Sequence, residues 1–283
     1  METGSAGSPP SDPSAAAPRI TLGDAVREFG LMAILMFLTV GVICAVFAGP
    51  WEAPHTEPRA GLAVVGAVVG ILLLVLIRSP WGRKSGGHMN PAITVALWSM
   101  GAFPGRAVVS YLAAQLAGGL LGTALARLVF GSVVEEVNYG AVTAAPDWTA
   151  SAVFAAEAGG GAAFAVLAGY FLTHPTRARW LPLAVGAGVA AAIVGFGPLS
   201  GGAVNPARQF GPAVLSGADR FLWIYLIAAP VGAAIAGAAL TWLRRRPLLT
   251  HRLCGFDHEN HATAAPRETG GVNDRHIRRP PTP

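Results

Sequence analysis

Hydrophobic residues in this chain gather in long uncharged runs that are separated by short polar segments. A helix that crosses a bilayer needs about 20 consecutive apolar residues, and a soluble domain rarely contains such a run. Six runs approach or exceed that length, at residues 29–51, 60–77, 107–126, 149–172, 180–199 and 221–243. The pattern therefore predicts an all-α membrane protein with six transmembrane helices.

Two further apolar runs, residues 93–100 and 210–215, are too short to cross a bilayer. Each follows the same phrase, Ser-Gly-Gly-X-X-Asn-Pro-Ala, at residues 85–92 and 200–207. Asparagine is a preferred helix N-cap and proline a preferred first helical residue. We therefore predict two half-helices whose positive N-terminal ends form a functional centre. The residues of this centre are Asn90, Pro91, Ala92, Asn205, Pro206 and Ala207.

The repeated phrase divides the chain into two halves, at about residues 23–130 and 148–246. Three predicted spans lie in each half, so the halves have opposite orientations in the membrane, and inverted repeats place their site near the midplane. Each half also carries one acid near or within its first span, Glu28 or Glu157. An ionisable residue at membrane depth is usually functional, although Glu28 also suits an interfacial charge.

Composition and charge agree with a membrane protein: 53% of the residues are hydrophobic and only 12% are charged. The net charge of +5 does not indicate nucleic-acid binding, because the basic residues lie in short loops and the tail. Basic loops mark the cytoplasmic side, so both termini are expected there, in the plasma or inner membrane. The basic side holds Arg19, Arg27, Arg78, Arg83, Lys84, Arg177, Arg179 and the arginines at 244–246; the opposite loops hold Glu52 and Glu57 with Arg59, then Glu135, Glu136 and Asp147.

The two ends of the chain are polar and rich in small residues, which predicts a disordered segment at 1–22 and a disordered cytoplasmic tail at 247–283. The tail contains His251, Cys254, His258, His261 and His276, whose spacing suits a zinc site less well than a disordered tail. We expect no metal and no other cofactor.

The repeated phrases resemble the two signatures of the aquaporin and glycerol-facilitator family, the major intrinsic proteins. The second signature continues as Asn-Pro-Ala-Arg-Gln-Phe-Gly-Pro-Ala, and the resemblance covers roughly residues 25–243. It implies the aquaporin-like fold, a lipid-embedded homotetramer with a pore in each subunit, and hydrogen bonds from the re-entrant loops to Glu28 and Glu157. For His88, in the first loop, we expect a structural hydrogen-bonding role rather than a pH sensor.

The resemblance also implies a selectivity filter. Arg208, directly after the second Asn-Pro-Ala, matches the arginine of the family's outer constriction, and the family's spacings add Gly70, Ile193 and Gly202. Strict water channels of the family usually have phenylalanine and histidine at the first two positions. Glycine and isoleucine here imply a wide filter, similar to those of members that pass glycerol, urea or uncharged metalloid acids.

The predicted function is a passive channel for water and small neutral solutes. Two helix N-termini, the amides of Asn90 and Asn205, and Arg208 would exclude protons and cations. The alternatives are a strict water channel of the same family and a secondary transporter with inverted repeats. An enzyme is not expected, because no paired carboxylates, nucleophile–base pair or phosphate-binding loop stands out.

Overall fold

The structure, a computed structural model, describes residues 20–48, 58–243 and 247–255. Within these ranges it contains α-helices and one short 3-10 helix but no strand, which confirms the predicted all-α class. The predictions for residues 1–19, for Glu52 and Glu57, for the arginines at 244–246, and for the tail beyond residue 255 lie outside the described residues.

Five of the described helices are long and apolar enough to cross a membrane. They are α1 (Leu22–Phe47), α2 (Pro58–Arg78), α5 (Gly105–Phe130), α7 (Ala150–Leu172) and α11 (Leu222–Leu243). The sixth predicted span forms a shorter helix, α9 (Leu181–Phe196), of 16 residues. At 1.5 Å per residue it is about 24 Å long, because the chain turns after Phe196 where the sequence pattern had predicted continued helix.

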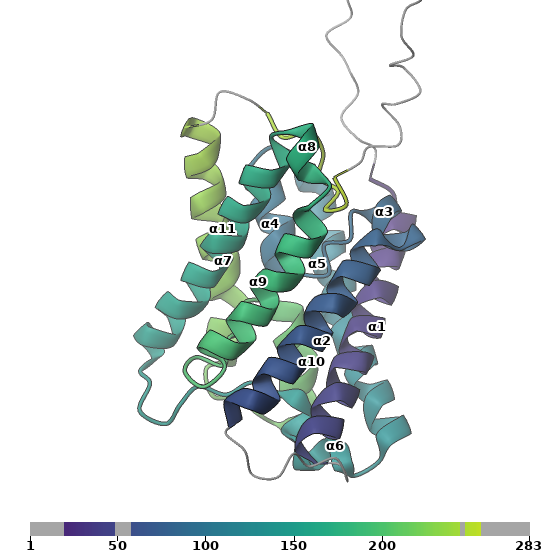
Figure 1. Cartoon of the computed structure of the whole chain (residues 1–283), viewed down its shortest axis with the longest axis vertical. Coiled ribbons are helices and arrows are strands. Elements are labelled where there is room, and N and C mark those ends of the chain that lie inside the picture. Colours follow the sequence, from purple (N-terminus) through teal and green to yellow (C-terminus); the bar gives the residue numbers. More distant parts are fainter. Residues whose placement is uncertain (1–19, 49–57, 244–246, 256–283) are drawn as a thin grey trace, which may run out of the picture.

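The two predicted half-helices are present as α4 (Pro91–Ser99) and α10 (Pro206–Ser216). In Figure 1, α4 extends toward the end of the bundle that carries α3 (Pro80–Ser85) and α8 (Pro175–Ala178), whereas α10 extends toward the opposite end. That opposite end carries two short elements, α6 (Val133–Glu136) and the 3-10 helix η1 (Asn138–Gly140). The half-helices therefore point away from each other, and their N-termini face the middle of the bundle.

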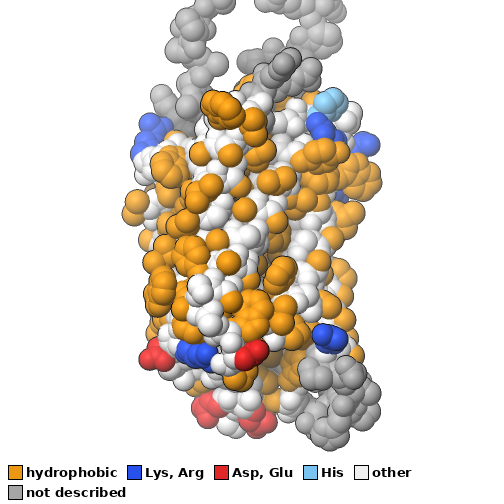
Figure 2. Space-filling model, turned by 90° about the vertical axis from the view of Figure 1, so that its left-hand side faces the viewer, with side chains coloured by type: hydrophobic (Ala, Val, Ile, Leu, Met, Phe, Trp, Pro, Cys, Tyr) orange, Lys and Arg blue, Asp and Glu red, His pale blue; other side chains and the backbone are white. Residues whose placement is uncertain are grey.

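Charge separates the two ends of the bundle. The basic end, beside α3 and α8, carries Arg27, Arg78, Arg83, Lys84, Arg177 and Arg179 with one acid, Asp24; the acidic end, beside α6, carries Glu135, Glu136, Asp147 and Asp219 together with Arg59, Arg127 and Arg220. Figure 2 shows hydrophobic side chains over the side of the molecule between these ends, with acidic side chains gathered at one of them. This distribution is the one expected of a protein surrounded by lipid.

Glycines allow the principal helix pairs to cross closely. A Cβ atom added to Gly118 of α5 would collide with the carbonyl of Phe29 in α1, and one added to Gly232 of α11 would collide with that of Ala158 in α7. Gly70 of α2 faces α9 in the same way, because an added Cβ would lie 2.7 Å from the carbonyl oxygen of Gly186. Such small-residue contacts are typical of helices that pack inside membranes.

The chain returns to the bundle after α11. Residues 247–255, which we call the C-terminal strap, have no regular secondary structure and pack against the basic end (Figure 1). The sequence pattern had predicted a disordered tail from residue 247 onward, and the strap departs from that prediction. Its residues from Thr250 to Cys254 are buried, including His251.

Candidate functional site

The two asparagines of the repeated phrase cap the half-helices, as predicted. The side-chain oxygen of Asn90 accepts a hydrogen bond from the backbone N–H of Ala92 at 2.8 Å. The side-chain oxygen of Asn205 accepts bonds from Ala207 at 3.0 Å and from Arg208 at 3.3 Å. Because each oxygen is used in the cap, each side-chain NH2 group points away from its own helix.

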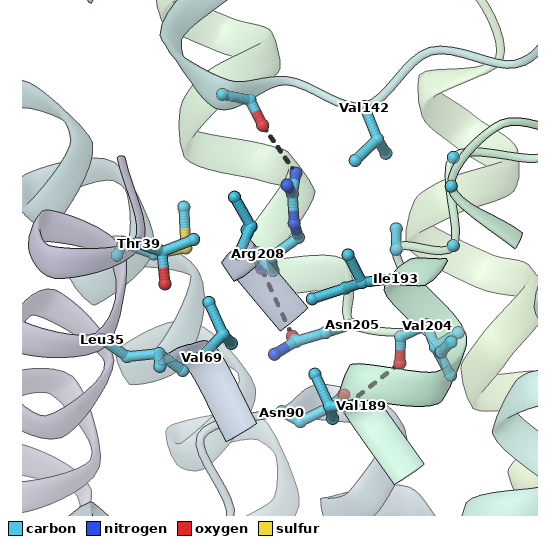
Figure 3. Close-up of a pocket in the computed structure, with 18 of the residues that line it drawn as sticks. Leu35, Thr39, Val69, Asn90, Val142, Val189, Ile193, Val204, Asn205 and Arg208 are labelled. Carbon is cyan, nitrogen blue, oxygen red and sulfur yellow. Dashed lines mark hydrogen bonds between the residues drawn. The ribbon is translucent and has the colours of Figure 1, made fainter. Parts of the chain in front are cut away.

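Those NH2 groups join the two halves of the chain. Asn90 Nδ2 donates to the carbonyl of Val204 at 3.1 Å, and Asn205 Nδ2 donates to the carbonyl of Met89 at 2.9 Å. Figure 3 shows the bond between Asn90 and Val204 beside the labelled Asn205. Each amide therefore uses one of its two hydrogens for the opposite loop and keeps one for a molecule in the cavity that both asparagines line.

The two residues just before the asparagines have an unusual backbone. Met89 has a φ angle of 46° and Val204 one of 45°, in the left-handed region that residues other than glycine rarely occupy, β-branched valine least of all. This conformation persists because both sides of each residue are held: its N–H bonds to a buried glutamate and its carbonyl bonds to the opposite asparagine.

Glu28, in α1, supports the first re-entrant loop. One of its carboxylate oxygens accepts bonds from the hydroxyl of Ser85 at 2.6 Å and from the N–H of His88 at 3.0 Å. The other accepts bonds from the N–H of Met89 at 2.7 Å and from the side chain of Gln115 at 2.9 Å. The interfacial alternative for Glu28 is thereby excluded, because its side chain is fully buried.

Glu157, in α7, repeats this arrangement in the second half. Its carboxylate accepts bonds from the hydroxyl of Ser200 at 2.9 Å and from the backbone N–H groups of Ala203 at 3.2 Å and Val204 at 2.6 Å. These contacts satisfy loop backbone that has no helical partner inside the membrane. The predicted bonds between both acids and the re-entrant loops are therefore present in the structure.

His88 is held on both sides by hydrogen bonds, which agrees with a structural role for its side chain. Its Nδ1 atom lies 3.1 Å from the hydroxyl of Thr94, and its Nε2 atom lies 3.1 Å from the carbonyl oxygen of His251 in the C-terminal strap. A carbonyl oxygen can only accept, so Nε2 carries the proton. Nδ1 of the neutral ring then accepts from Thr94.

Both asparagines open onto a cavity of about 240 Å³ that runs between the two halves of the bundle. Toward the acidic end its wall includes Phe47, Leu62 and Gly197, and toward the basic end it includes Leu73, His88 and Val185. The wall is mainly apolar, with few polar side chains. Those that could bond to a small molecule are Thr39, Asn90, Thr143, Asn205 and Arg208. Figure 3 shows the arrangement of Thr39, Asn90, Asn205 and Arg208.

Three of the four residues predicted for the filter line this cavity: Ile193, Gly202 and Arg208. Gly70 is not among the lining residues, and we correct that assignment. It lies in the crossing of α2 with α9, whereas Val65 and Val69 are among the residues that α2 contributes to the wall. The count of twenty residues back from Asn90 thus selects a residue of the helix crossing, next to Val69 of the cavity wall.

The guanidinium of Arg208 is fixed in place. Its Nη1 atom donates to the carbonyl of Gly140 at 2.8 Å, in the loop at the acidic end. The neighbouring Gln209 holds the same loop, because its side chain exchanges hydrogen bonds with the N–H and the carbonyl of Val142, both at 2.9 Å. The remaining guanidinium N–H groups of Arg208 can face the cavity.

Sequence reasoning missed Thr39, a polar residue on the cavity wall. It lies in α1 and only 4% of its surface is exposed. Within the described part of the chain, its hydroxyl has no hydrogen-bond partner. Figure 3 shows this side chain on the opposite side of the cavity from Ile193. The signal in the sequence was a lone threonine between apolar residues. In the structure, a buried hydroxyl without a hydrogen-bond partner is uncommon enough to indicate that a ligand bonds to it.

Known proteins are similar to this chain in sequence and in fold. A family model described as "Major intrinsic protein" matches residues 20–240. The chain is 37% identical to aquaporin NIP1-3 of Oryza sativa subsp. japonica, over 70% of this chain and 69% of that protein. It is 34% identical to nodulin-26 of Glycine max, over 77% of this chain and 80% of that protein.

An archaeal relative and a solved structure extend the comparison. The chain is 32% identical to the probable aquaporin AqpM of Archaeoglobus fulgidus, over 72% of this chain and 92% of that protein. The X-ray structure of the aquaglyceroporin from Plasmodium falciparum superimposes with a TM-score of 0.64, at 20% identity, over 79% of this chain and all of that one. At that identity the superposition shows a shared fold.

Proposed function

The chain belongs to the major intrinsic protein family of membrane channels for water and small solutes, and on that premise we propose that it conducts small neutral solutes passively through the cavity between its half-helices. The observation that carries this proposal is the pair of asparagine-capped helix N-termini that open onto one cavity. The proposal includes water as a permeant.

Charge exclusion follows from the groups around the cavity. Each half-helix places roughly half a positive charge at its N-terminus, and Asn90 and Asn205 each keep one N–H that can donate to a molecule in the cavity. The oxygen of a neutral solute can accept such bonds. A cation would meet two positive dipoles and the guanidinium of Arg208 after losing its hydration, whose loss alone costs on the order of 20 kcal/mol before relaxation.

The wall chemistry supports solutes larger than water. Ile193, Gly202 and Val69 are apolar or small, so they suit the carbon face of a polyol, while Arg208 and the Thr39 hydroxyl can bond to its oxygens. We therefore include glycerol, urea and uncharged metalloid acids among the permeants.

Charge also supports an orientation. We assign the basic end to the cytoplasm and both termini to the same side, in the cell membrane, because arginine and lysine accumulate in cytoplasmic loops. Family membership supports a homotetramer, with one pore in each subunit.

Stopped-flow light scattering on proteoliposomes tests the proposal. We expect water, glycerol and urea fluxes above those of empty liposomes, linear in the solute gradient. Fast water flux with glycerol and urea at background would contradict the wide filter and favour a strict water channel. Saturable uptake that depends on an ion gradient would instead favour a transporter.

A further inference from the structure

The C-terminal strap crosses the basic end of the bundle and bonds to both halves of the chain. The backbone N–H of Leu249 donates to the carbonyl of Leu172, the last residue of α7, at 2.9 Å. The N–H of Leu253 donates to the carbonyl of Gly86, in the first re-entrant loop, also at 2.9 Å. In Figure 1 the strap is the yellow segment beside α8.

The strap is buried more deeply than a surface segment usually is. His251, Leu253 and Cys254 expose 2%, 1% and 3% of their surface. Leu253 and Cys254 belong to the same apolar core as Leu73 and Val185, which line the cavity. Connecting segments normally run over the surface, so this degree of burial shows that the strap packs closely against the bundle.

This contact lies where the cavity ends. At the basic end the cavity wall stops at Leu73, His88 and Val185. One helical turn farther toward that end, Ile77 of α2 and Leu181 of α9 are completely buried in the same core as the strap. Apolar side chains and the strap therefore lie between the cavity and a second hollow, of about 390 Å³, which is lined at the basic end by Arg78, Arg83, Arg179, Trp180 and Cys254.

Polar groups also link the strap to the pore loop. His88 Nε2 donates to the carbonyl of His251, and Gly86 offers its carbonyl to Leu253. The imidazole of His251 packs edge-on against the ring of Phe103, with centroids 5.4 Å apart. Its own Nε2 atom is buried and has no hydrogen-bond partner within the described ranges. A buried polar atom without a partner costs free energy, so it weakens the binding of the strap.

We propose that residues 247–255 act as a reversible plug, which closes the basic end of the pore when bound and must leave before solutes pass. The inference rests on the proposed channel function. A plug formed by a short segment of nine residues can be released without unfolding the bundle, because the long helices also pack directly against one another, as α1 does against α5 and α7 against α11. The strap thus differs from the rest of the core in being removable.

Three chains of different length test the plug in proteoliposomes: the full chain, a chain that ends at Gly255 and keeps the strap, and a chain that ends at Arg246 and lacks it. If the plug is bound about 90% of the time, its removal raises the flux per channel about tenfold. We expect that increase for the chain ending at Arg246, and full-length flux for the chain ending at Gly255. Equal or lower flux in a folded chain ending at Arg246 would overturn the plug alone. Background flux from all three would overturn the channel function as well.

A disulfide lock tests the plug without truncation. A Cβ atom on Gly255 would lie 2.9 Å from the Cβ of Ala178 but only 2.5 Å from the carbonyl group of Ala178, and Gly255 has a φ angle of 78°, so this end of the strap must shift outward before a disulfide forms. Ala178→Cys with Gly255→Cys is made in a chain that also carries Cys44→Ala and Cys254→Ala. Oxidation should reduce the flux to background and a reductant should restore it, while Ala178→Cys alone and Gly255→Cys alone, the second of which also reports any effect of the added side chain on the strap, should respond to neither. Equal flux through the oxidised and reduced double variant, with the disulfide confirmed by mass spectrometry, would refute the plug.

Discussion

The side chain of Asn205 donates a hydrogen bond to the carbonyl of Met89 across 2.9 Å, so the cap of the second half-helix also holds the loop before the first. Asn90 returns the interaction through the carbonyl of Val204 at 3.1 Å. Each asparagine thus has three duties: it caps its helix, fixes the opposite loop and keeps one N–H for the cavity. The proposed channel depends on the fixed orientation of these two amides.

Arg208→Ala should let protons or cations leak, because it removes the guanidinium charge from the cavity wall. We expect proton flux to rise by on the order of tenfold, which corresponds to a barrier lowered by about 1.4 kcal/mol. A pH-sensitive dye inside proteoliposomes measures it. Arg127→Ala is the matched control, since Arg127 pairs with Glu135 at the acidic end, away from the cavity. A proton flux through Arg208→Ala equal to that of the parent chain would show that this arginine is not a filter residue.

Thr39→Val should slow glycerol and urea while leaving the fold intact. Valine keeps the shape but loses the hydroxyl, and one hydrogen bond is worth about 0.5–1.5 kcal/mol, so we expect a reduction of about 2- to 10-fold. The control is Thr123→Val, because the Thr123 hydroxyl bonds to the carbonyl of Gly119 within α5 and does not line the cavity. Equal solute fluxes in the two variants would exclude a role for Thr39 in selectivity.

Glu157→Ala should destabilise the protein strongly. The change leaves the N–H groups of Ala203 and Val204 and the hydroxyl of Ser200 buried without their acceptor, at about 1–3 kcal/mol each. We expect the free energy of unfolding in detergent to fall by at least about 3 kcal/mol and solute flux to be lost. The exposed Glu136→Ala should unfold like the parent chain. Parent-like stability of Glu157→Ala would mean that the second loop does not need this acid.

Gly70→Ala distinguishes helix packing from a filter role. The added methyl group meets the carbonyl of Gly186 at 2.7 Å, and overpacking of this kind costs about 1–3 kcal/mol. We therefore expect a lower unfolding temperature. Gly195→Ala is the control, because nothing lies within 4 Å of its added Cβ and a helical alanine is slightly preferred to glycine. If Gly70→Ala instead changed the relative fluxes of different solutes with no loss of stability, Gly70 would have to be assigned to the filter after all.

Acidification should release the strap. Burial lowers the pKa of His251 well below its ordinary value, and the nearby charges of His88 and Arg252 lower it further. The other titratable group beside His88 is Glu28, whose carboxylate accepts a hydrogen bond from the backbone N–H of His88. Once the strap has left, His251 titrates near its ordinary pKa of about 6.5 and binds more protons than in the bound strap. Binding of the strap is therefore strongest above that pH and weakens as the pH falls below it.

Solute flux measured between pH 7.5 and 5.5 checks this prediction. We expect the full chain to conduct more at the acidic end of the range, by up to about tenfold per pH unit in the release equilibrium. His251→Gln, which cannot be protonated, should lose this dependence. The same acid response in both chains would assign the effect to a group other than His251.

The sequence predicted the half-helices because their physical signals were local, whereas the bonds from the loops to Glu28 and Glu157 were implied by the resemblance to the family. An asparagine followed by proline specifies a helix start, and an acid inside an apolar run needs buried partners. Both Asn90 and Glu157 have the predicted contacts. The cap at Asn90 needed no knowledge of how distant helices pack, whereas the partner of Glu157 lies 43 residues along the chain.

Features that depend on packing were not predictable in the same way. Which face of α2 lines the cavity is decided by its crossing with α9, so an offset counted back from Asn90 selected Gly70, whereas Val65 and Val69 reach the wall. The burial of the strap depends on a surface to which α7, α8 and the loops at Gly86 and Phe103 all contribute. Its sequence, with arginine and histidine beside leucine, carries too weak a hydrophobic pattern to indicate that surface.

The exchange of hydrogen bonds between the loops has a consequence for biosynthesis. A ribosome delivers the first three spans to the bilayer before the second half exists, and at that moment Asn90 lacks its acceptor and the carbonyl of Met89 lacks its donor. The strained backbone at Met89 is then held from one side only, by Glu28. The first pore loop can therefore mature only after the second has been made, so that assembly of the conducting path is a late event that both halves complete together.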